Sequence, residues 1–267
     1  MQNLKIGLLF LFGAVSCCLI GCVNFSYLKK PPHIPRYITN KYSLSRMDNV
    51  VIDGPVNVVI VNAKNRSLII SGMDNVLAKY DVSIIPHGVY IKVPLLLTNK
   101  YQERINISAP FLNKLVLING VNVWANYLHV SNLELTTTSN SDCAGINLRG
   151  QIFAAITKIH QQKDGKISVG WLDSEKIDVN SLNGGVVWLS GEADTLTGNM
   201  SSSSYLDSKY FRVSNIRIRA NGISRADIFP LGTLRAFTSD RGNVFYYNRP
   251  ENIFINSIKS GNVLMIP

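Results

Sequence analysis

Short polar turns alternate with apolar runs along most of the chain. In residues 176–191 (KIDVNSLNGGVVWLSG), Ile177 and Val179 alternate with polar residues, a small polar turn follows, and a second apolar run begins at Val186. From Leu115 onward this step recurs roughly every 20 residues, a period typical of solenoids. The recurrences lie near Val121, Cys143, Ile167, Val186, Tyr205, Ala226, Val244 and Val263. One such coil cannot bury its own apolar side chains, whereas stacked coils share a core. The pattern therefore predicts an all-β fold, a β-solenoid (β-helix) of irregular coils.

Shorter β-branched runs precede these coils. Residues 50–52 and 56–60 flank Gly54-Pro55, and Pro86-His87-Gly88 is typical of a hairpin turn. No stretch shows sustained helical periodicity, so we expect very little helix. The ends of a solenoid expose unpaired strand edges. We therefore expect the N-terminal strand and hairpin segment, which starts near Asp48, to cap one end.

Residues 1–21 are predicted to be a lipoprotein signal peptide. Lys5 precedes the uncharged, mostly apolar residues 6–20, a run shorter than the ~20 residues that a membrane-spanning helix needs. It ends in Leu19-Ile20-Gly21-Cys22, which resembles the bacterial lipobox. The resemblance implies cleavage before Cys22 and acyl chains, such as palmitate, on Cys22, which together would anchor the protein firmly in a membrane. The alternative is an ordinary secretory leader or an uncleaved anchor.

Residues 22–46 are predicted to be a basic tether, because Pro31, Pro32 and Pro35 lie among lysines and arginines without apolar periodicity. The solenoid domain then spans residues 47–267. Val23 follows the lipidation site where retention in the inner membrane usually requires Asp, so by analogy we expect the outer membrane of a Gram-negative bacterium. Cys17 and Cys18 would leave with the leader. Cys143 then remains as a small buried residue or, alternatively, a reactive thiol.

The segment at residues 47–58 (MDNVVIDGPVNV) resembles the opening of the putative auto-transporter adhesin, head-GIN domain family. Later coils of that family repeat an S-G-S-G-(D/N)-apolar turn, matched here at residues 139–142, 183–186, 201–204 and 260–263. Several family glycines are Asn or Ser in this chain, and Met47 stands where Phe is usual. The resemblance covers roughly residues 47–265. It implies a β-helix on an exported lipoprotein, with a role in adhesion.

The chain carries 27 Lys and Arg against 17 Asp and Glu, a formal net charge of +10. This sign favours anionic partners, but no nucleic-acid-binding module is visible, so we expect none. Arginines alternate with apolar residues toward the C-terminus, and stacked coils could align them in a ladder that binds an acidic glycan or lipopolysaccharide phosphate. The candidates are Arg212, Arg217, Arg219, Arg225, Arg235 and Arg241. The alternative is a solvated outer face.

Large aromatic residues fall at or after several coil turns. Exposed in a row they would form a platform for stacking sugars, and buried they would belong to the core. The candidates for sugar stacking are Trp124, Trp188, Tyr246 and Tyr247, and Trp171 has the same pattern.

Motifs for catalysis are scarce, and we predict no metal site and no cofactor. The four histidines are isolated, and no G-x-S-x-G motif occurs. Glu192 and Asp194 could act as a carboxylate pair on a strand, although the sequence favours a turn there; Asp227 and Asp240 lie further along.

The leading hypothesis is a non-catalytic, membrane-tethered envelope lipoprotein that acts as an adhesin or glycan-binding module. The alternatives are a carbohydrate-active β-helix enzyme (lyase or glycosidase) and a purely structural lipoprotein.

Overall fold

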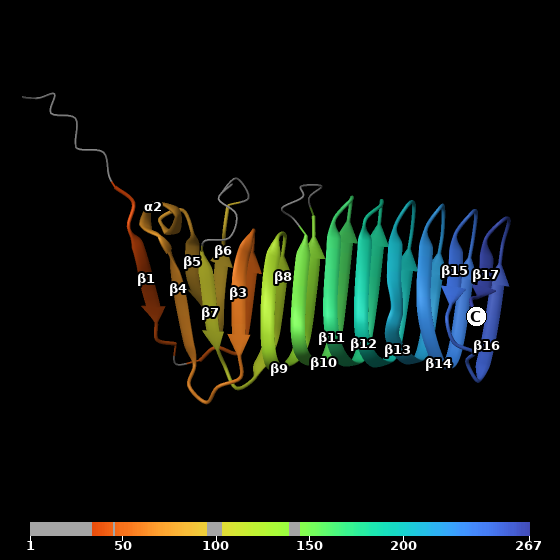
Figure 1. Cartoon of the computed structure of the whole chain (residues 1–267), viewed down its shortest axis with the longest axis horizontal. Coiled ribbons are helices and arrows are strands. Elements are labelled where there is room, and N and C mark those ends of the chain that lie inside the picture. Colours follow the sequence, from red (N-terminus) through yellow and green to blue (C-terminus); the bar gives the residue numbers. More distant parts are fainter. Residues whose placement is uncertain (1–33, 45, 95–102, 139–144) are drawn as a thin grey trace, which may run out of the picture. The chain divides into compact units, whose positions relative to one another are not determined.

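The computed structural model describes residues 34–267 apart from residues 45, 95–102 and 139–144. Arg36–Pro267 form one compact unit of stacked strands (Figure 1). The predicted signal peptide, Cys22, most of the predicted tether, Cys143 and the turn at residues 139–142 lie outside the described residues. Among the described residues, no helix has the length and apolar character to cross a membrane.

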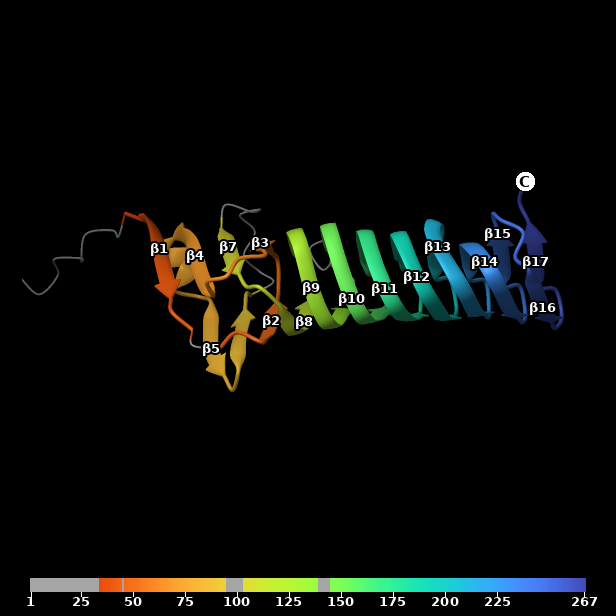
Figure 2. The ribbon, with the colours of Figure 1, turned by 90° about the horizontal axis from the view of Figure 1, so that it is seen from below.

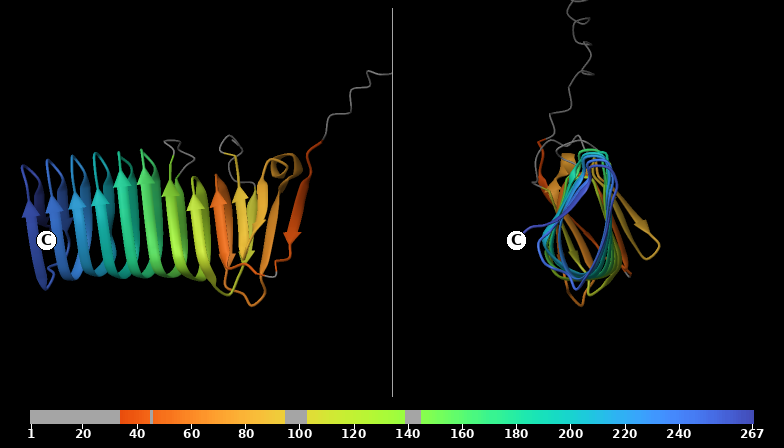
Figure 3. Two further views of the ribbon diagram at one scale, coloured as in Figure 1. Left: turned by 180° about the vertical axis from the view of Figure 1, so that it is seen from behind. Right: turned by 90° about the vertical axis from the view of Figure 1, so that its right-hand side faces the viewer.

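Long parallel strands form the body of the unit, each one rung of a stack (Figure 1). They are β9 (Val121–Thr137), β10 (Ile146–Gln162), β11 (Lys166–Leu182), β12 (Val186–Met200), β13 (Tyr205–Ala220) and β14 (Arg225–Thr238). The stack ends with the shorter β15 (Asn243–Tyr246), β16 (Asn252–Ser257) and β17 (Asn262–Met265). Viewed along its axis, the stack encloses one narrow core (Figure 3). The predicted β-solenoid is confirmed, and several strands begin within a few residues of the predicted recurrences.

Each coil bends twice and so has three segments. In β10 these are residues 146–148, 152–154 and 156–162, each paired in parallel with β11. Residues of other coils that pair in register with one of these segments form the equivalent segment of their own coil. We call the outward sides of the first, second and third segments, taken over all coils, the first, second and third faces. The pairing shifts register between Leu148 and Ile152, at the bend between the first and second segments.

Inward positions carry the apolar residues of the repeated pattern. In β11, Ile167, Val169, Leu172, Ile177 and Val179 are buried, while the residues between them are mostly exposed or half-buried. Neighbouring coils place apolar residues at the same level, so the core continues from rung to rung. Burial of each such side chain contributes about 1.5–3 kcal/mol.

In β9 to β12 the bend between the first and second segments contains a residue with a left-handed backbone. Gly150 (φ +121°) and Gly191 (φ +124°) supply it in β10 and β12. A Cβ atom at Gly191 would lie 2.0 Å from the carbonyl oxygen of Leu172, so only glycine fits. In β11 the same bend contains Trp171, with φ +57°.

The N-terminal part of the unit does not follow chain order. β2 (Asn49–Asp53) lies between β6 (Gly88–Lys92) and β8 (Leu112–Ile118), and β3 (Val56–Val61) lies between β7 (Arg104–Ser108) and β9. The first two strands of the domain are therefore inserted between later ones.

Antiparallel strands cover this end, as the sequence predicts (Figure 2). They are β1 (Tyr37–Tyr42), β4 (Ser67–Met73) and β5 (Asp81–Ile85), with the short helix α2 (Asp74–Leu77) beside them. β1 belongs to the stretch predicted to be tether. Tyr37–Tyr42 pair with Leu68–Met73 along the whole of β1. These pairings satisfy the backbone hydrogen-bonding groups of β1, so β1 is part of the sheet.

Candidate functional site

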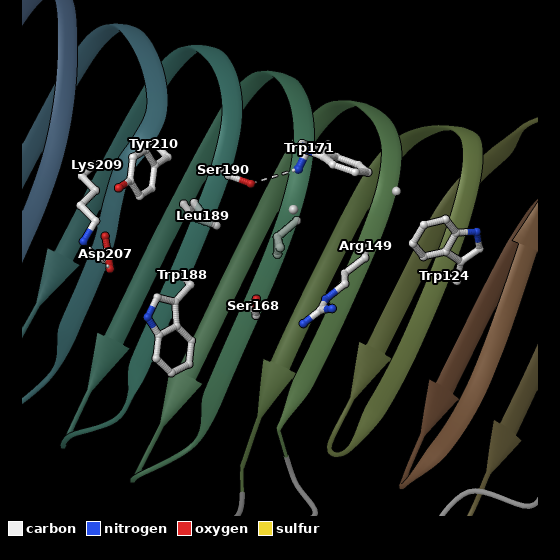
Figure 4. Close-up of a pocket in the computed structure, with 13 residues that line it drawn as sticks. Trp124, Arg149, Ser168, Trp171, Trp188, Leu189, Ser190, Asp207, Lys209 and Tyr210 are labelled. Atoms are coloured by element: carbon white, nitrogen blue, oxygen red, sulfur yellow. Dashed lines mark hydrogen bonds and ion pairs between the residues drawn. The ribbon is translucent and has the colours of Figure 1, made fainter.

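A groove of about 530 Å³ lies on the first face and crosses β9 to β13 (Figure 4). Trp124 lies at one end, Tyr210 and Lys209 lie at the other, and Trp171 and Trp188 stand on opposite sides between them. We call this surface the aromatic groove. It is lined by Trp124, Arg149, Trp171, Trp188, Asp207, Lys209 and Tyr210 above a floor of Ser168, Gly170 and Ser190.

The groove exists because small residues occupy the outward positions at its centre. Ser168 pairs in register with Trp188, and Ser190 pairs with Tyr210, so each small side chain has a large neighbour one rung away. A Cβ atom at Gly170 would meet only the Ser190 hydroxyl, at 3.7 Å. The floor therefore has room for a Cβ atom at Gly170.

The walls are aromatic rings that remain in contact with solvent. The exposed fractions are 53% for Trp124, 64% for Trp171, 37% for Trp188 and 74% for Tyr210. Single exposed apolar residues are common, but a contiguous exposed apolar patch usually marks an interaction surface. These four rings line one hollow, so they form such a patch.

Trp171 occupies a strained position. A left-handed backbone is rare for a bulky residue and costs of order 1–3 kcal/mol. The equivalent bends in β10 and β12 use glycine, and the one in β9 uses Tyr127, with φ +52°. The Ser190 hydroxyl accepts a hydrogen bond from the Trp171 backbone N–H at 3.2 Å, which helps to hold the bend. The indole ring of Trp171 forms one wall of the aromatic groove (Figure 4).

Charged groups lie at both ends of the aromatic groove. At one end, Arg149 Nε donates a hydrogen bond to Asn147 Oδ1 at 3.1 Å. At the other, Lys209 Nζ lies 3.6 Å from Asp207 Oδ2 and 5.4 Å from the centre of the Tyr210 ring. The apolar rings are therefore bordered by hydrogen-bonding groups that can fix the orientation of a ligand.

A second hollow of about 490 Å³ adjoins the aromatic groove and shares Trp124 and Arg149 with it. Outward asparagines on successive rungs line it, namely Asn57, Asn122 and Asn147. Asn122 Nδ2 donates to Asn57 Oδ1 at 3.4 Å. The first face thus offers an aromatic surface that continues into an amide-lined one, which we call the amide hollow.

The structure brings together part of the predicted aromatic platform. Trp124, Trp171 and Trp188 line the aromatic groove. Tyr246 instead packs half-buried against the core, and the Tyr247 hydroxyl donates toward Asp227 Oδ2 at 3.5 Å. Sequence analysis missed Tyr210. An irregularity at the β13 bend shifts its pairing between Trp188 and Ser190, and strict alternation cannot reveal such a shift.

The six candidate arginines do not form one ladder. Arg217, Arg219 and Arg235 lie on the third face, Arg212 lies on the second face, and Arg241 lies in a turn. A ladder would require all six at matching positions of the coils, and the bends send them to different faces.

Arg225 is engaged within the fold. Its Nε donates to Asp227 Oδ1 at 2.7 Å, and its guanidinium lies 4.6 Å from the centre of the Phe245 ring. The hydrogen bonds to Asp227 raise the pKa of Arg225 above its ordinary value. Burial, with a hydrogen bond to Asp227, likewise raises the pKa of Tyr205. Asp227 itself is buried.

The turn predicted for Glu192 and Asp194 was wrong. Both lie in β12, on either side of the buried Ala193, and both face outward from the second face. Glu192 pairs in register with Asp173, so carboxylates gather there on two rungs. Of the other acids, Asp227 is held by Arg225 and Asp240 pairs with Lys259. Within the described part of the chain, no group of three or more His, Cys, Asp and Glu residues is placed to hold a metal ion.

The stacked coils define a β-solenoid domain with a groove on one outer face. Residues 46–250 match the family described as putative auto-transporter adhesin, head GIN domain, and the chain belongs to this family. The resemblance carried by residues 47–58 is thereby confirmed. Family membership indicates an adhesin-like protein of the cell surface or envelope.

Solved structures share the fold. A putative adhesin from Parabacteroides merdae has a TM-score of 0.70 at 14% identity, covering 87% of this chain and 97% of its own. A putative adhesin from Parabacteroides distasonis has a TM-score of 0.71 at 14% identity, covering 86% and 97%. A putative lipid binding protein from the same species has a TM-score of 0.67 at 14% identity, covering 87% and 97%. No curated protein matches the chain.

Proposed function

We propose that this protein is a non-catalytic, membrane-tethered envelope lipoprotein that binds a glycan in the aromatic groove. The observation that carries the proposal is the set of four solvent-exposed rings around a floor of small residues. Sugar rings present C–H groups on their faces and hydroxyl groups at their edges. The aromatic walls suit the faces, and the flanking polar residues suit the edges.

The size and charge of the site support an oligosaccharide with acidic groups. The aromatic groove has the volume of ordinary ligand pockets, about 300–1,000 Å³, and the amide hollow extends it along the stack. The Arg149 guanidinium lies between the two hollows and could bind a sugar carboxylate through paired hydrogen bonds.

Membrane attachment is supported by the lipobox sequence ending at Cys22. We place the protein in the outer membrane of a Gram-negative bacterium, with the basic, proline-containing tether between the lipid and the solenoid. Mass spectrometry of the chain isolated from membranes tests this step. The expected result is acyl chains on an N-terminal Cys22 and none in the Cys22→Ser variant. An unacylated Cys22 would overturn the tethering.

Glycan binding is tested with the full chain carrying Cys22→Ser, so that no acyl group is attached, on an array of neutral and acidic oligosaccharides. Gly170→Val should fill the floor and weaken binding more than tenfold, because buried contacts at the centre of a site dominate affinity. Trp188→Ala should do the same by removing a wall. Phe111→Ala, an exposed ring outside the groove, is the matched control and should bind as the parent does.

Unchanged glycan binding by a folded Gly170→Val variant would overturn the assignment of the groove. A lipid is the second candidate ligand, because a groove lined by tryptophan also suits acyl chains and one structural neighbour is called a putative lipid binding protein. Vesicles and a soluble short-chain lipid tested in parallel separate the two. Loss of lipid binding in Gly170→Val without any glycan binding would favour the lipid.

A further inference from the structure

Three arginines converge on the third face near the C-terminal end of the stack. Arg217 in β13 and Arg235 in β14 are paired directly in register, and Arg219 lies two residues along the same strand. Paired strands lie about 4.8 Å apart, so the stems of Arg217 and Arg235 are close neighbours. With Phe237, Phe254 and Asn256 they line a hollow of about 300 Å³. We call Arg217, Arg219 and Arg235 the arginine cluster.

Aromatic rings support two of the three guanidinium groups. The Arg219 guanidinium carbon lies 5.6 Å from the centre of the Phe237 ring, and that of Arg235 lies 5.1 Å from the centre of the Phe254 ring. Stacking on a ring limits the orientations of a guanidinium but leaves its N–H edge free for hydrogen bonds. The cluster is therefore partly ordered before any ligand arrives.

On the third face of the earlier coils, negative and positive side chains alternate from one coil to the next. At the arginine cluster they do not alternate. The outward position that holds Arg217 and Arg235 holds Glu134, Lys158 and Asp178 on three earlier coils. On that part of the face Lys114 pairs with Glu134 at 3.1 Å, and Lys176 pairs with Asp178 at 3.3 Å. None of the three clustered arginines makes an ion pair with a residue that the structure describes. Like charges directly opposite each other destabilise a sheet, so an anion at this place would relieve the repulsion.

We propose that the arginine cluster binds a phosphomonoester, at a site separate from the aromatic groove. Such a group carries between one and two negative charges at neutral pH, and its oxygens match the paired N–H groups of a guanidinium. The side-chain amide of Asn256 adds a donor, and the Phe237 and Phe254 rings can contact the apolar part of the ester. The aromatic groove lies on the first face, so the two sites use different segments of the coils.

Calorimetric titration of the full chain carrying Cys22→Ser tests the site, with glucose 1-phosphate as the soluble probe. The double variant Arg217→Gln/Arg235→Gln should lose more than tenfold in affinity. The control Arg212→Gln/Arg241→Gln removes the same charge from the second face and from a turn, and should change affinity less than twofold. Equal losses in both variants, or no binding by the parent, would overturn the proposal.

Two further measurements identify the chemistry. Affinity for glucose 1-phosphate should rise as the pH increases from 5 to 7, because the second proton of a phosphomonoester leaves near pH 6. Equally tight binding of glucose 6-sulfate would overturn phosphate recognition. Vesicles containing phosphatidic acid distinguish the source. Binding to vesicles with little binding of the sugar phosphate assigns the site to a lipid head group, and the reverse assigns it to a phosphorylated glycan.

Failure of this proposal is distinguishable from failure of the glycan-binding proposal. The arginine double variant should bind a neutral oligosaccharide in the aromatic groove as the parent does. The Gly170→Val variant should bind glucose 1-phosphate as the parent does. A phosphate affinity that falls with Gly170→Val would place the anion in the aromatic groove and overturn the separate site.

Discussion

The first and third faces belong to the same coils yet differ in their outward side chains. On the first face, small residues in β11 and β12 leave a hollow that is walled by aromatic rings. On the third face, the equivalent coils carry charged and polar residues that meet their neighbours rung by rung. Inside, both segments bury the same kinds of aliphatic side chain. The inward positions therefore fix the fold, and the outward positions are free to specify what each face binds.

Structural neighbours illustrate this division. The solved structures from Parabacteroides share the fold with this chain at 14% identity. Such a fold requires only the inward pattern and the bends, since each coil contacts its immediate neighbours. The aromatic groove and the arginine cluster depend on particular outward residues, so the shared fold carries no information about them.

The largest expected effect comes from the bend between the first and second segments, on which the packing of a whole coil depends. Gly191→Val would place a branched side chain against the Leu172 carbonyl at a backbone φ of +124°. We expect a loss of more than about 3 kcal/mol in the free energy of unfolding, with loss of binding on both faces. Urea denaturation followed by circular dichroism measures it. Gly170→Ala is the control and should be close to neutral, and parental stability in Gly191→Val would show that the bend is not fixed by glycine.

Adjacent residues in β13 separate the interior from the surface. Phe211 is fully buried, and Tyr210 beside it is 74% exposed. Phe211→Ala should destabilise the protein by about 3–5 kcal/mol, and binding on both faces should fall together as the population unfolds. Tyr210→Ala should change the stability by less than about 0.5 kcal/mol and weaken only binding in the aromatic groove. Equal stability losses would contradict the division between inward and outward positions.

Much of the fold could be predicted from sequence because the inward pattern repeats. Polar turns such as residues 183–185, followed by apolar runs, correctly predicted where the coils begin. The N-terminal order could not be predicted in this way. The insertion of β2 and β3 between later strands depends on pairings between residues far apart in the chain, and hydrophobic alternation within each strand is the same in either order.

The candidate site could be predicted only in part, for a related reason. Trp124 and Trp188 stand out in the sequence as large aromatic residues close to coil turns, and both line the aromatic groove. The face on which an outward residue lies depends on where the coil bends. The bend in β13 shifts Tyr210 into the groove, and bends elsewhere separate Arg212, Arg225 and Arg241 from the arginine cluster. Alternation distinguishes inward from outward but does not distinguish the three outward faces.

An effect of intermediate size is expected when two arginines are compared that differ in whether they form an ion pair. Arg225 bonds to the buried Asp227, whereas Arg217 has no ion pair within the described residues. Asp227→Asn removes the charge on which these hydrogen bonds depend and should cost about 1–3 kcal/mol in unfolding free energy. It should also lower the pKa of Tyr205 toward its ordinary value, because the carboxylate disfavours the phenolate. Denaturation and a phenolate absorbance titration measure the two effects. Arg217→Gln, the control, should leave the stability unchanged or slightly raised.

The smallest effect is expected at an exposed ion pair between adjacent turns near the C-terminal end. The Lys259 ammonium donates to Asp240, and this hydrogen bond lowers the pKa of the Asp240 carboxyl below its ordinary value of 3.8. A lowered pKa in the folded state stabilises the protein above the unfolded-state pKa, and the stabilisation is lost as the pH falls through the folded-state value. Lys259→Met should therefore be slightly less stable than the parent at pH 7, and the difference should disappear in acid. Both side chains are largely exposed, so screening keeps the effect small.

Thermal melts at pH 7 and pH 2.5, repeated in high salt, measure this difference in stability. A difference that persists at pH 2.5 would mean that the Lys259 stem acts by packing, not by its charge.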